Sequence, residues 1–111
     1  MFCNTPLKSF AGDLSSLTDG RYMFYDCSEL TSFTSELPSL TKGGDMFRGC
    51  KLDAESLEYI ADSINDVSSL TISGADAKVI CIGYNCSAAL ADAAYDTITG
   101  KGWSCEMTYN A

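Results

Sequence analysis

Hydrophobic and polar positions in the first half of the chain recur at a fixed interval. Residues 7–20 (LKSFAGDLSSLTDG) align with residues 30–43 (LTSFTSELPSLTKG), and leucine, serine, phenylalanine, acidic, threonine and glycine positions agree. At the same offset of 23, residues 23–27 (MFYDC) align with residues 46–50 (MFRGC). So many agreements at one offset are unlikely by chance, and they indicate an internal repeat.

A repeat of this length with several apolar positions is typical of a solenoid, in which each coil buries its apolar side chains against the next coil. We therefore expect Phe10 to stack on Phe33. Residues 30–34 (LTSFT) are rich in β-branched and aromatic side chains and predict a short strand, whose copies would pair in parallel. Gly20 and Gly43 are expected at turns, because glycine adopts a left-handed conformation at little cost.

The pattern changes after residue 52 and predicts helix, strand, helix and strand in that order. The first helix is expected at about 54–66 with Asp53 as its N-cap, and the second at about 88–99 with Ser87 as its N-cap. The side chains expected to face the core are Leu57, Ile60, Ala61 and Ile64 in the first helix and Leu90, Ala91, Ala94 and Ile98 in the second. The strands are expected at residues 78–84 and 103–109, and a short extended piece at 70–72 is an open alternative.

Alternating helices and strands favour a parallel sheet with right-handed crossovers. The two predicted strands start about one repeat apart, so we expect the sheet of the repeats to continue through them. Residues 53–111 would then form a helix–strand–helix–strand cap that closes the C-terminal end of one solenoid domain.

Residues 23–33 (MFYDCSELTSF) resemble the BspA-like branch of leucine-rich repeats. That branch has a small or apolar residue, then Phe, two residues, Cys, two residues, and Leu-Thr-Ser with an apolar residue. Met23 replaces the usual alanine, which is closer to the Met-Phe variant of Mycoplasma-type surface proteins and of gut phage tail-associated proteins. The resemblance covers residues 1–52 as two and a half repeats, because residues 1–3 (MFC) echo the same element.

The resemblance implies an α/β fold, namely a right-handed leucine-rich-repeat solenoid with a parallel sheet on one face. It implies a non-enzymatic binding or adhesion module of a bacterial surface protein or a phage tail-associated protein. Such a module would be extracellular or part of a virion, and its partner would be a protein or a glycan on a cell surface. The family supplies no catalytic residue and no cofactor, and a purely structural spacer or assembly element is the alternative function.

Exposed residues on the strand face are the first candidates for ligand contacts, because solenoids often bind through such faces. Two tyrosines flank the buried Met-Phe element and are candidates for an exposed aromatic strip. The candidate binding surface comprises Lys8, Ser9, Thr31, Ser32, Thr34, Tyr22 and Tyr25.

Composition and charge exclude several classes of partner. The 111 residues are enough for one domain, and seven basic against fifteen acidic residues give a net charge of −8. This balance argues against nucleic acid and against an anionic membrane surface. No apolar run approaches the roughly 20 residues of a membrane span, and residues 1–8 have neither the basic start nor the apolar run of a signal peptide.

The cysteines are expected to be mainly structural. Cys27 and Cys50 are equivalent in the repeat and predict a ladder of buried, reduced thiols, while Cys81 and Cys105 lie in the predicted strands. A disulfide between Cys81 and Cys86 remains open. The chain has no histidine, so only a lysine or a helix N-terminus could activate a cysteine, and the best candidate nucleophile is Cys86, whose pKa the start of the second helix would lower. A thiol-dependent enzyme is the remote alternative.

Two further features concern the surface. Acidic residues recur with the repeat and form either a solvated face or a column for calcium or a cationic partner. The N-terminal edge begins inside a repeat, so Phe2, Leu7 and Phe10 would lie at an open edge. Either earlier coils precede it or another chain covers it, which includes self-association. The acidic residues are Asp13, Asp19, Asp26, Glu29 and Glu36.

Overall fold

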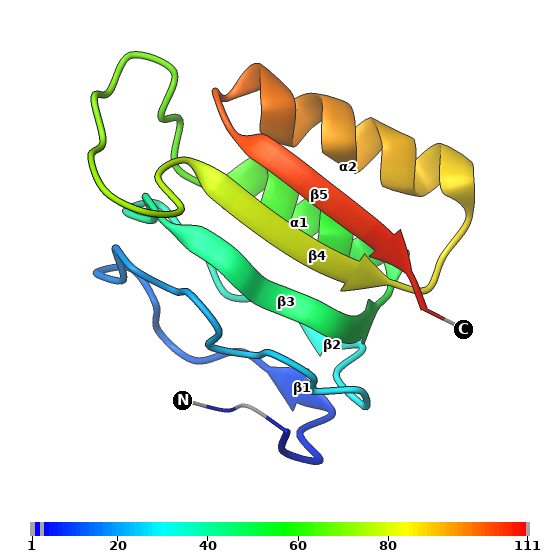
Figure 1. Ribbon diagram of the computed structural model, residues 1–111. Helices are drawn as coiled ribbons and strands as arrows, with labels where there is room; N and C mark the ends of the chain where they lie inside the picture. The colour runs from blue at the N-terminus through cyan, green and yellow to red at the C-terminus, as the bar shows by residue number, and fades with distance from the viewer. Residues whose placement is uncertain (1, 3, 111) are drawn as a thin grey trace.

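The computed structural model describes residue 2 and residues 4–110, and these form an α/β domain with parallel sheets and two helices (Figure 1). A three-stranded sheet has the order β3-β4-β5, and a small second sheet pairs β1 with β2. The elements are β1 (Ser9–Phe10), β2 (Ser32–Phe33), β3 (Gly43–Leu52), α1 (Ala54–Ser63), β4 (Val79–Tyr84), α2 (Ala88–Gly100) and β5 (Ser104–Tyr109).

The predicted order of helices and strands in the second half is confirmed. Strands β4 and β5 pair in parallel without interruption from Val79 opposite Ser104 to Tyr84 opposite Tyr109. The pairing of β3 with β4 is also parallel but shifts its register twice along the strand. Each crossover between neighbouring strands passes through a helix, so both helices lie on the same side of the sheet (Figure 1).

The ladder of the larger sheet extends into the earlier repeats. The N–H groups of residues 20, 22, 24 and 26 donate to the carbonyl oxygens of residues 42, 44, 46 and 48 at 2.7–3.1 Å. The N–H groups of Phe2 and Asn4 donate in turn to the carbonyl oxygens of Met23 and Tyr25 at 2.8 and 3.0 Å. Segments from successive repeats therefore run side by side in the same direction as β3.

The sheet continues from a different segment than expected. The predicted strand at 30–34 is β2, which pairs with β1 through Ser9 opposite Ser32 and Phe10 opposite Phe33. Strands β4 and β5 do not extend this pair but join β3, the Met-Phe-Cys segment, which the sequence pattern did not predict as a strand. The sequence pattern did not indicate a strand here because β3 contains glycines and charged side chains, which have low strand propensity.

Gly20 opens a turn as expected, because its carbonyl oxygen accepts the backbone N–H of Met23 at 3.1 Å, but neither Gly20 nor Gly43 has the expected left-handed conformation. Gly43 begins β3, and the backbone N–H of Gly20 joins the ladder. Both glycines are buried where neighbours approach closely: a Cβ atom would lie 2.8 Å from the Met46 sulfur at Gly20 and 3.1 Å from the Ile80 side chain at Gly43. Packing, and not backbone conformation, therefore requires glycine at these positions.

Left-handed backbone conformations occur at other positions of the repeat. Asn4, Asp26 and Gly49 occupy equivalent places in successive rungs and have φ angles of 57°, 56° and 83°. Tyr22 and Asp45 are also equivalent and have φ angles of 61° and 55°. The repeat thus conserves left-handed backbone positions even where the residue is not glycine, although asparagine and aspartate tolerate them better than most.

Phenylalanines of successive repeats form the centre of the core. The rings of Phe2, Phe24 and Phe47 stack in one column, with centroid distances of 5.4 Å and interplanar angles of 9° and 3°. A second column stacks Phe10 on Phe33 at 5.8 Å and 12°, which confirms the expected contact. Burying one such side chain stabilises the fold by roughly 1.5–3 kcal/mol.

Cysteines form the expected buried ladder beside the first column. The Cys27 thiol donates to the carbonyl oxygen of Phe2 at 2.7 Å, and the Cys50 thiol donates to that of Phe24 at 3.2 Å. Both cysteines are fully buried and free, and burial raises the pKa of Cys50 to about 12. The prediction of buried thiols at these positions is therefore confirmed.

The cysteine position of the first, shortened repeat belongs to Thr5. Its hydroxyl also donates to the carbonyl oxygen of Phe2, at 2.8 Å, and lies 3.6 Å from the Cys27 sulfur. The sequence pattern had assigned this position to Cys3, which lies outside the described residues. A residue is deleted in the first repeat just after this position, which shifts the offset from 23 to 22 for Phe2 and Phe24.

Helix α1 begins as predicted and ends earlier. Asp53 is its N-cap, and its carboxylate accepts a hydrogen bond from the backbone N–H of Ser56 at 2.9 Å. The helix ends at Ser63 instead of residue 66 because Ile64 turns to an extended conformation. The predicted inward stripe of this helix is buried throughout.

No strand forms at residues 70–72, which lie in an irregular connection before β4.

Helix α2 departs from the prediction at two residues. Ser87 occupies the N-cap position, but its side chain makes no capping hydrogen bond. Leu90 was expected to face the core and is 53% exposed, whereas Ala91, Ala94 and Ile98 are buried. The buried face of α2 is narrower than the prediction because the helix packs mainly against α1 and β5.

The segment after α2 caps the end of α1. The Lys101 ammonium donates to the carbonyl oxygens of Ala61, Asp62 and Ile64 at 2.8, 2.9 and 3.1 Å. The indole N–H of Trp103 donates to the carbonyl oxygen of Asn65 at 2.8 Å. The last carbonyl groups of a helix lack intrahelical partners and carry partial negative charge, so a cation there is stabilising.

Candidate functional site

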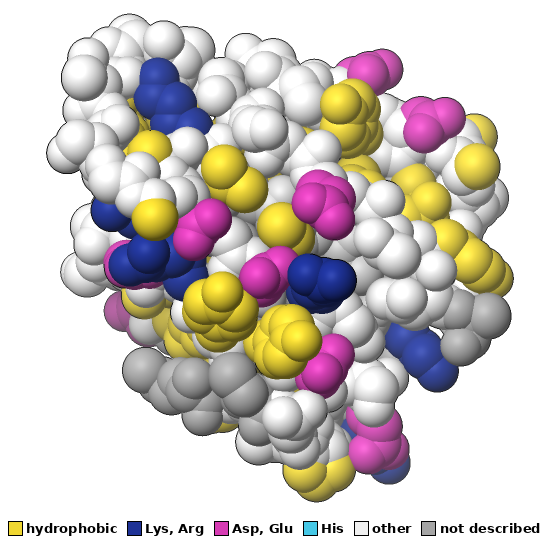
Figure 2. Space-filling view, viewed as in Figure 1, with side chains coloured by type: hydrophobic (Ala, Val, Ile, Leu, Met, Phe, Trp, Pro, Cys, Tyr) yellow, Lys and Arg dark blue, Asp and Glu magenta, His cyan; other side chains and the backbone are white. Residues whose placement is uncertain are grey.

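One face of the larger sheet is not covered by either helix. Figure 1 shows α1 behind β4 and β5 and α2 alongside the edge strand β5, and the other side of these strands faces the viewer. Figure 2, from the same direction, shows hydrophobic, basic and acidic side chains interleaved on this side. We call this side the open face; its aromatic and charged side chains come from the segment 20–26, β3, the loop before β4, and β5.

Two tyrosines form the aromatic part of the open face. The rings of Tyr22 and Tyr25 meet edge to face, with centroids 5.8 Å apart and an interplanar angle of 75°. A tight turn holds them, because the backbone N–H of Tyr25 donates to the carbonyl oxygen of Tyr22 and the N–H of Tyr22 bonds to Gly44. Tyr22 is 50% exposed and Tyr25 is half-buried, so the pair presents an aromatic surface on a fixed backbone.

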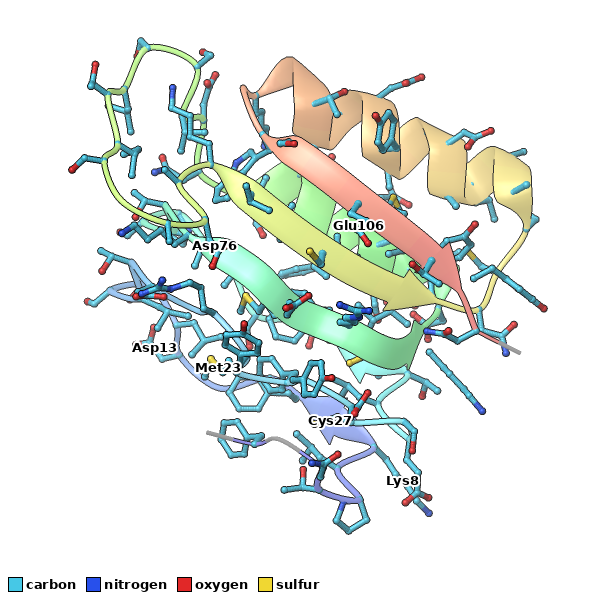
Figure 3. The ribbon with its side chains drawn as sticks, viewed as in Figure 1. Lys8, Asp13, Met23, Cys27, Asp76 and Glu106 are labelled. Atoms are coloured by element: carbon cyan, nitrogen blue, oxygen red, sulfur yellow. The ribbon has the colours of Figure 1, made fainter. Side chains whose placement is uncertain are left out.

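An arginine–carboxylate group lies on one side of the tyrosines. The Arg21 guanidinium binds Asp19 through two hydrogen bonds of 2.8 and 3.0 Å and lies 3.8 Å from a carboxylate oxygen of Asp76. The hydrogen bond from Arg21 lowers the pKa of Asp19, and Asp19 raises the pKa of Arg21. Asp76 sits over Gly44, where a Cβ atom would lie 2.6 Å from its carboxyl carbon. Figure 3 labels Asp76 at this end of the sheet.

A second arginine lies on the other side. The Arg48 guanidinium is 3.4 Å from the Asp45 carboxylate, and its side chain is 60% exposed. The hydrogen bond that Arg48 donates to Asp45 and the negative charge of that carboxylate raise the pKa of Arg48, and the charge of Glu106 adds to the shift. Parallel pairing of β3, β4 and β5 brings Glu106, labelled in Figure 3, to this part of the face.

Cys81 lies on β4 between these carboxylates. Its thiol is 4.0 Å from a Glu106 oxygen, and the residue is buried. Burial raises the pKa of Cys81, and the negative charges of Glu106 and Asp45 raise it further. The thiol therefore stays protonated near neutral pH and contributes packing to the face rather than a nucleophile.

The open face can hold a polar ligand in three ways. Aromatic rings stack on sugar rings or peptide groups, guanidinium groups donate paired hydrogen bonds, and carboxylates accept hydrogen bonds from hydroxyl or amide groups. The described residues contain no group of three or more side chains that could hold a metal ion, and the chain has no histidine.

The structure separates the predicted binding surface into two parts. Tyr22 and Tyr25 lie together on the open face. The other five residues lie along β1 and β2, in the second sheet, beside α1; Figure 3 shows Lys8 far from Asp76. Lys8, Ser9 and Thr31 are exposed, whereas Ser32 and Thr34 are half-buried.

The β1–β2 surface is tied to helix α1. The buried Ser56 hydroxyl donates to the carbonyl oxygen of Thr31 at 3.1 Å and accepts the N–H of Phe33 at 2.8 Å. The first turn of α1 therefore takes the place that another strand would occupy beside β2. This leaves only a short strip of β1 and β2 for ligand contacts.

The expected activation of Cys86 is wrong. The thiol precedes α2 and is half-buried, but burial raises its pKa and the Asp53 carboxylate adds to that shift. Cys81 and Cys86 are free thiols in the structure. The effect predicted from the helix start is therefore smaller than the opposing effects of desolvation and a nearby negative charge.

The recurring acidic residues are all exposed, and they do not converge on one place. Asp19 pairs with Arg21, and Asp13 accepts a hydrogen bond from the backbone N–H of Ser15 at 2.9 Å. Within the described chain they do not form a metal-binding group.

At the N-terminal edge, the side chains expected to be open are half-buried against the core: Phe2, Leu7 and Phe10.

The sequence analysis missed several charged residues of the open face, among them Arg21, Arg48, Asp76 and Glu106. A signal for two of them existed. The repeat aligns Arg21 with Gly44 and Tyr25 with Arg48, so these positions differ between copies while their neighbours agree. Where most positions of a repeat agree between copies, a position that differs is typical of an exposed side chain, because buried positions require similar residues in each copy.

No family model, no curated protein and no solved structure matches this chain. Within the described residues, no helix has the length and apolar character needed to cross a membrane.

Proposed function

We propose that this chain is a right-handed leucine-rich-repeat solenoid that acts as a non-enzymatic binding or adhesion module of a bacterial surface or phage tail-associated protein. It binds a protein or glycan on a cell surface through the open face. The observation that carries the proposal is the exposed Tyr22–Tyr25 pair, which two arginines flank on the side of the sheet away from the helices.

Contacts between successive repeats support the solenoid. Two columns of stacked phenylalanines and a continuous parallel ladder join residues that are equivalent in the repeat. Side chains also bond to the backbone of the preceding repeat: Ser35 to Gly12, Thr41 to Thr18 and Ser56 to Thr31. Helices α1 and α2 with β4 and β5 then form the C-terminal cap of the same domain.

The chemistry of the open face supports recognition. Tyrosine offers a large rigid contact area at low entropic cost, and arginine fits planar polar groups, which is why both are frequent at binding sites. The arginines are held by carboxylates, so they are oriented before a ligand arrives. The raised pKa of Cys81 and of Cys86 argues against a thiol-dependent enzyme.

Glycan arrays and intact bacterial cells test this function. The fluorescently labelled protein is applied to arrays of bacterial and mucosal glycans and to a panel of cells, and its binding is compared with that of Tyr25→Ala and of Tyr22→Asn. Asparagine is chosen because residue 22 has a positive φ angle. We expect the variants to lose binding by about tenfold or more, as for central aromatic contacts.

Tyr59→Ala is the matched control, because Tyr59 is similarly exposed but lies on α1. If the wild-type protein binds no glycan and no cell, the proposal of a binding module is wrong, and a role as a structural spacer explains the protein better. If Tyr59→Ala loses binding as much as the open-face variants, the site is misplaced.

A further inference from the structure

Helices α1 and α2 pack against each other, with α1 behind the sheet and α2 alongside β5 in Figure 1, and a groove of about 530 Å³ lies between them. Its size is within the range of ligand-binding clefts. Small apolar side chains, among them Ala61 of α1 and Ala94 of α2, form its lining. The groove is lined by residues of the two helices and shares none of them with the open face.

The α1 wall of the groove is acidic. Glu55, Glu58 and Asp62 lie at i, i+3 and i+7 and so share one face of the helix. The ion pairs of the described residues involve only Arg21 and Arg48, so these three carboxylates are not neutralised by a described cation. The ammonium of Lys101 is bound to backbone carbonyl oxygens at the end of α1.

The α2 wall is apolar and small. Leu90, Ala93 and Thr97 have the same i, i+3, i+7 spacing and face the carboxylates across the groove. Leu90 is 53% exposed, which is unusual for a leucine on the same helix as three buried apolar residues. An exposed leucine beside small residues leaves room for an apolar side chain of a partner.

The acidic surface continues past α1. A second hollow of about 400 Å³ is lined by Glu36, Tyr59, Asp62 and Ser63. Asp62 belongs to both hollows, so negative charge lies on both sides of α1. A ligand in the groove therefore meets a negative potential over a wide area and an apolar strip along one wall.

We propose that this groove binds a basic amphipathic segment of another protein, with its apolar residues on Leu90 and Ala93 and its lysines or arginines on Glu55, Glu58 and Asp62. Such segments lay an apolar face into a groove, and opposite charge steers their approach. A second copy of this chain is a poor occupant, because each copy carries a net charge of −8 and the same acidic wall. The proposal does not depend on the function of the open face.

Peptide binding tests the proposal. The probes are a synthetic helix of two LKKLLKL heptads and its counterpart of two LEELLEL heptads, each labelled for fluorescence anisotropy. We expect saturable binding of the lysine peptide to the intact protein and none of the glutamate peptide. Glu58→Lys and Leu90→Glu are expected to weaken binding by about tenfold, because one removes an attraction and the other adds a charge to the apolar wall.

Asp96→Lys is the matched control for Glu58→Lys, because it changes the net charge equally from an exposed position of α2 that does not line the groove. It should weaken binding less than about twofold, as should Tyr25→Ala on the open face. Equal loss in Asp96→Lys and Glu58→Lys would mean non-specific attraction, and that result overturns the proposal. Absence of saturable lysine-peptide binding overturns it as well, and so does a dimer that Leu90→Glu dissociates in sedimentation.

Discussion

The rings of Phe24 and Phe47 stack at 5.4 Å with only 3° between their planes, although a full repeat separates them in the sequence. Both side chains are completely buried. The same column continues to Phe2, so a phenylalanine ring occupies the equivalent core position in three successive segments. Interactions of this kind should be coupled, because each ring packs on the next.

The first prediction concerns this column. Phe24→Leu should lower the free energy of unfolding by about 1–3 kcal/mol, since the smaller side chain loses the four ring contacts that Phe24 makes. In a double-mutant cycle with Phe47→Leu we expect a coupling energy of at least about 0.5 kcal/mol, as for residues in contact. Urea denaturation followed by circular dichroism measures both quantities. Additive effects in the cycle would contradict direct packing between the rings.

The second prediction concerns Lys101. Replacing its ammonium in Lys101→Met leaves three carbonyl oxygens at the end of α1 without their donor. We expect a loss of about 1–3 kcal/mol in the free energy of unfolding, the usual effect of removing one partner of a charged hydrogen bond. Lys8→Met, at an exposed position of the edge, should change stability by less than about 0.5 kcal/mol. Equal effects of the two substitutions would show that Lys101 does not cap the helix.

The third prediction concerns the thiols. Burial raises the pKa of Cys50 and of Cys105 to about 12, so neither should react with iodoacetamide near neutral pH while the protein is folded. Cys86 is half-buried and should react first among the described cysteines, though more slowly than a free thiol because its pKa is raised. Mass spectrometry of time-resolved alkylation measures the order. Rapid modification of Cys50 in the native protein would contradict the structure.

The fourth prediction concerns pH. Asp19 has a lowered pKa in the folded protein because it bonds to Arg21. Its contribution to stability is therefore present above its unfolded pKa of about 3.9 and is lost as the pH falls through the lower, folded value. We expect stability to stay level from about pH 7 to 5 and to decline below about pH 4. In Asp19→Asn the decline should be smaller, and an unchanged profile would remove Asp19 as its source.

The fifth prediction separates the two parts of the binding surface. If the ligand of the proposed module sits on the open face, Thr31→Arg on the β1–β2 surface should leave glycan or cell binding within about twofold, whereas Tyr25→Ala should reduce it by about tenfold. The reverse result would assign ligand binding to the β1–β2 surface. Circular dichroism of both variants checks that each retains its fold.

The sequence could predict what depends on the period of the chain. The offset of 23 residues correctly paired Phe10 with Phe33, because core positions accept few residue types and therefore stay recognisable. The helix–strand–helix–strand order was also accessible, since an apolar stripe at helical spacing and alternating strand residues are local signals.

The missing strand had no such local signal. Strand β3 contains three glycines and three charged residues among ten, a composition that local propensity associates with turns. Its extended conformation comes from hydrogen bonds on both sides, to the segment 20–26 and to β4. These are long-range contacts, so the prediction placed the continuing sheet on the wrong segment of the repeat.

For the same reason, only part of the open face could be predicted from the sequence. Tyr22 and Tyr25 lie three residues apart and could be singled out together. Arg48 and Glu106 lie on β3 and β5 and meet only because β4 pairs with both strands. The residue-by-residue pattern does not show which strands become neighbours, and so it could not assemble this group of charges.

The contact of Lys101 with α1 also has a kinetic consequence. The carbonyl oxygens of Ala61, Asp62 and Ile64 accept hydrogen bonds from Lys101, which lies 37–40 residues later in the chain. We therefore expect the last turn of α1 to gain protection from proteases only after Lys101 has bonded to these carbonyl groups during folding. The order in which the parts of this domain become resistant to proteases should follow from that single ammonium group.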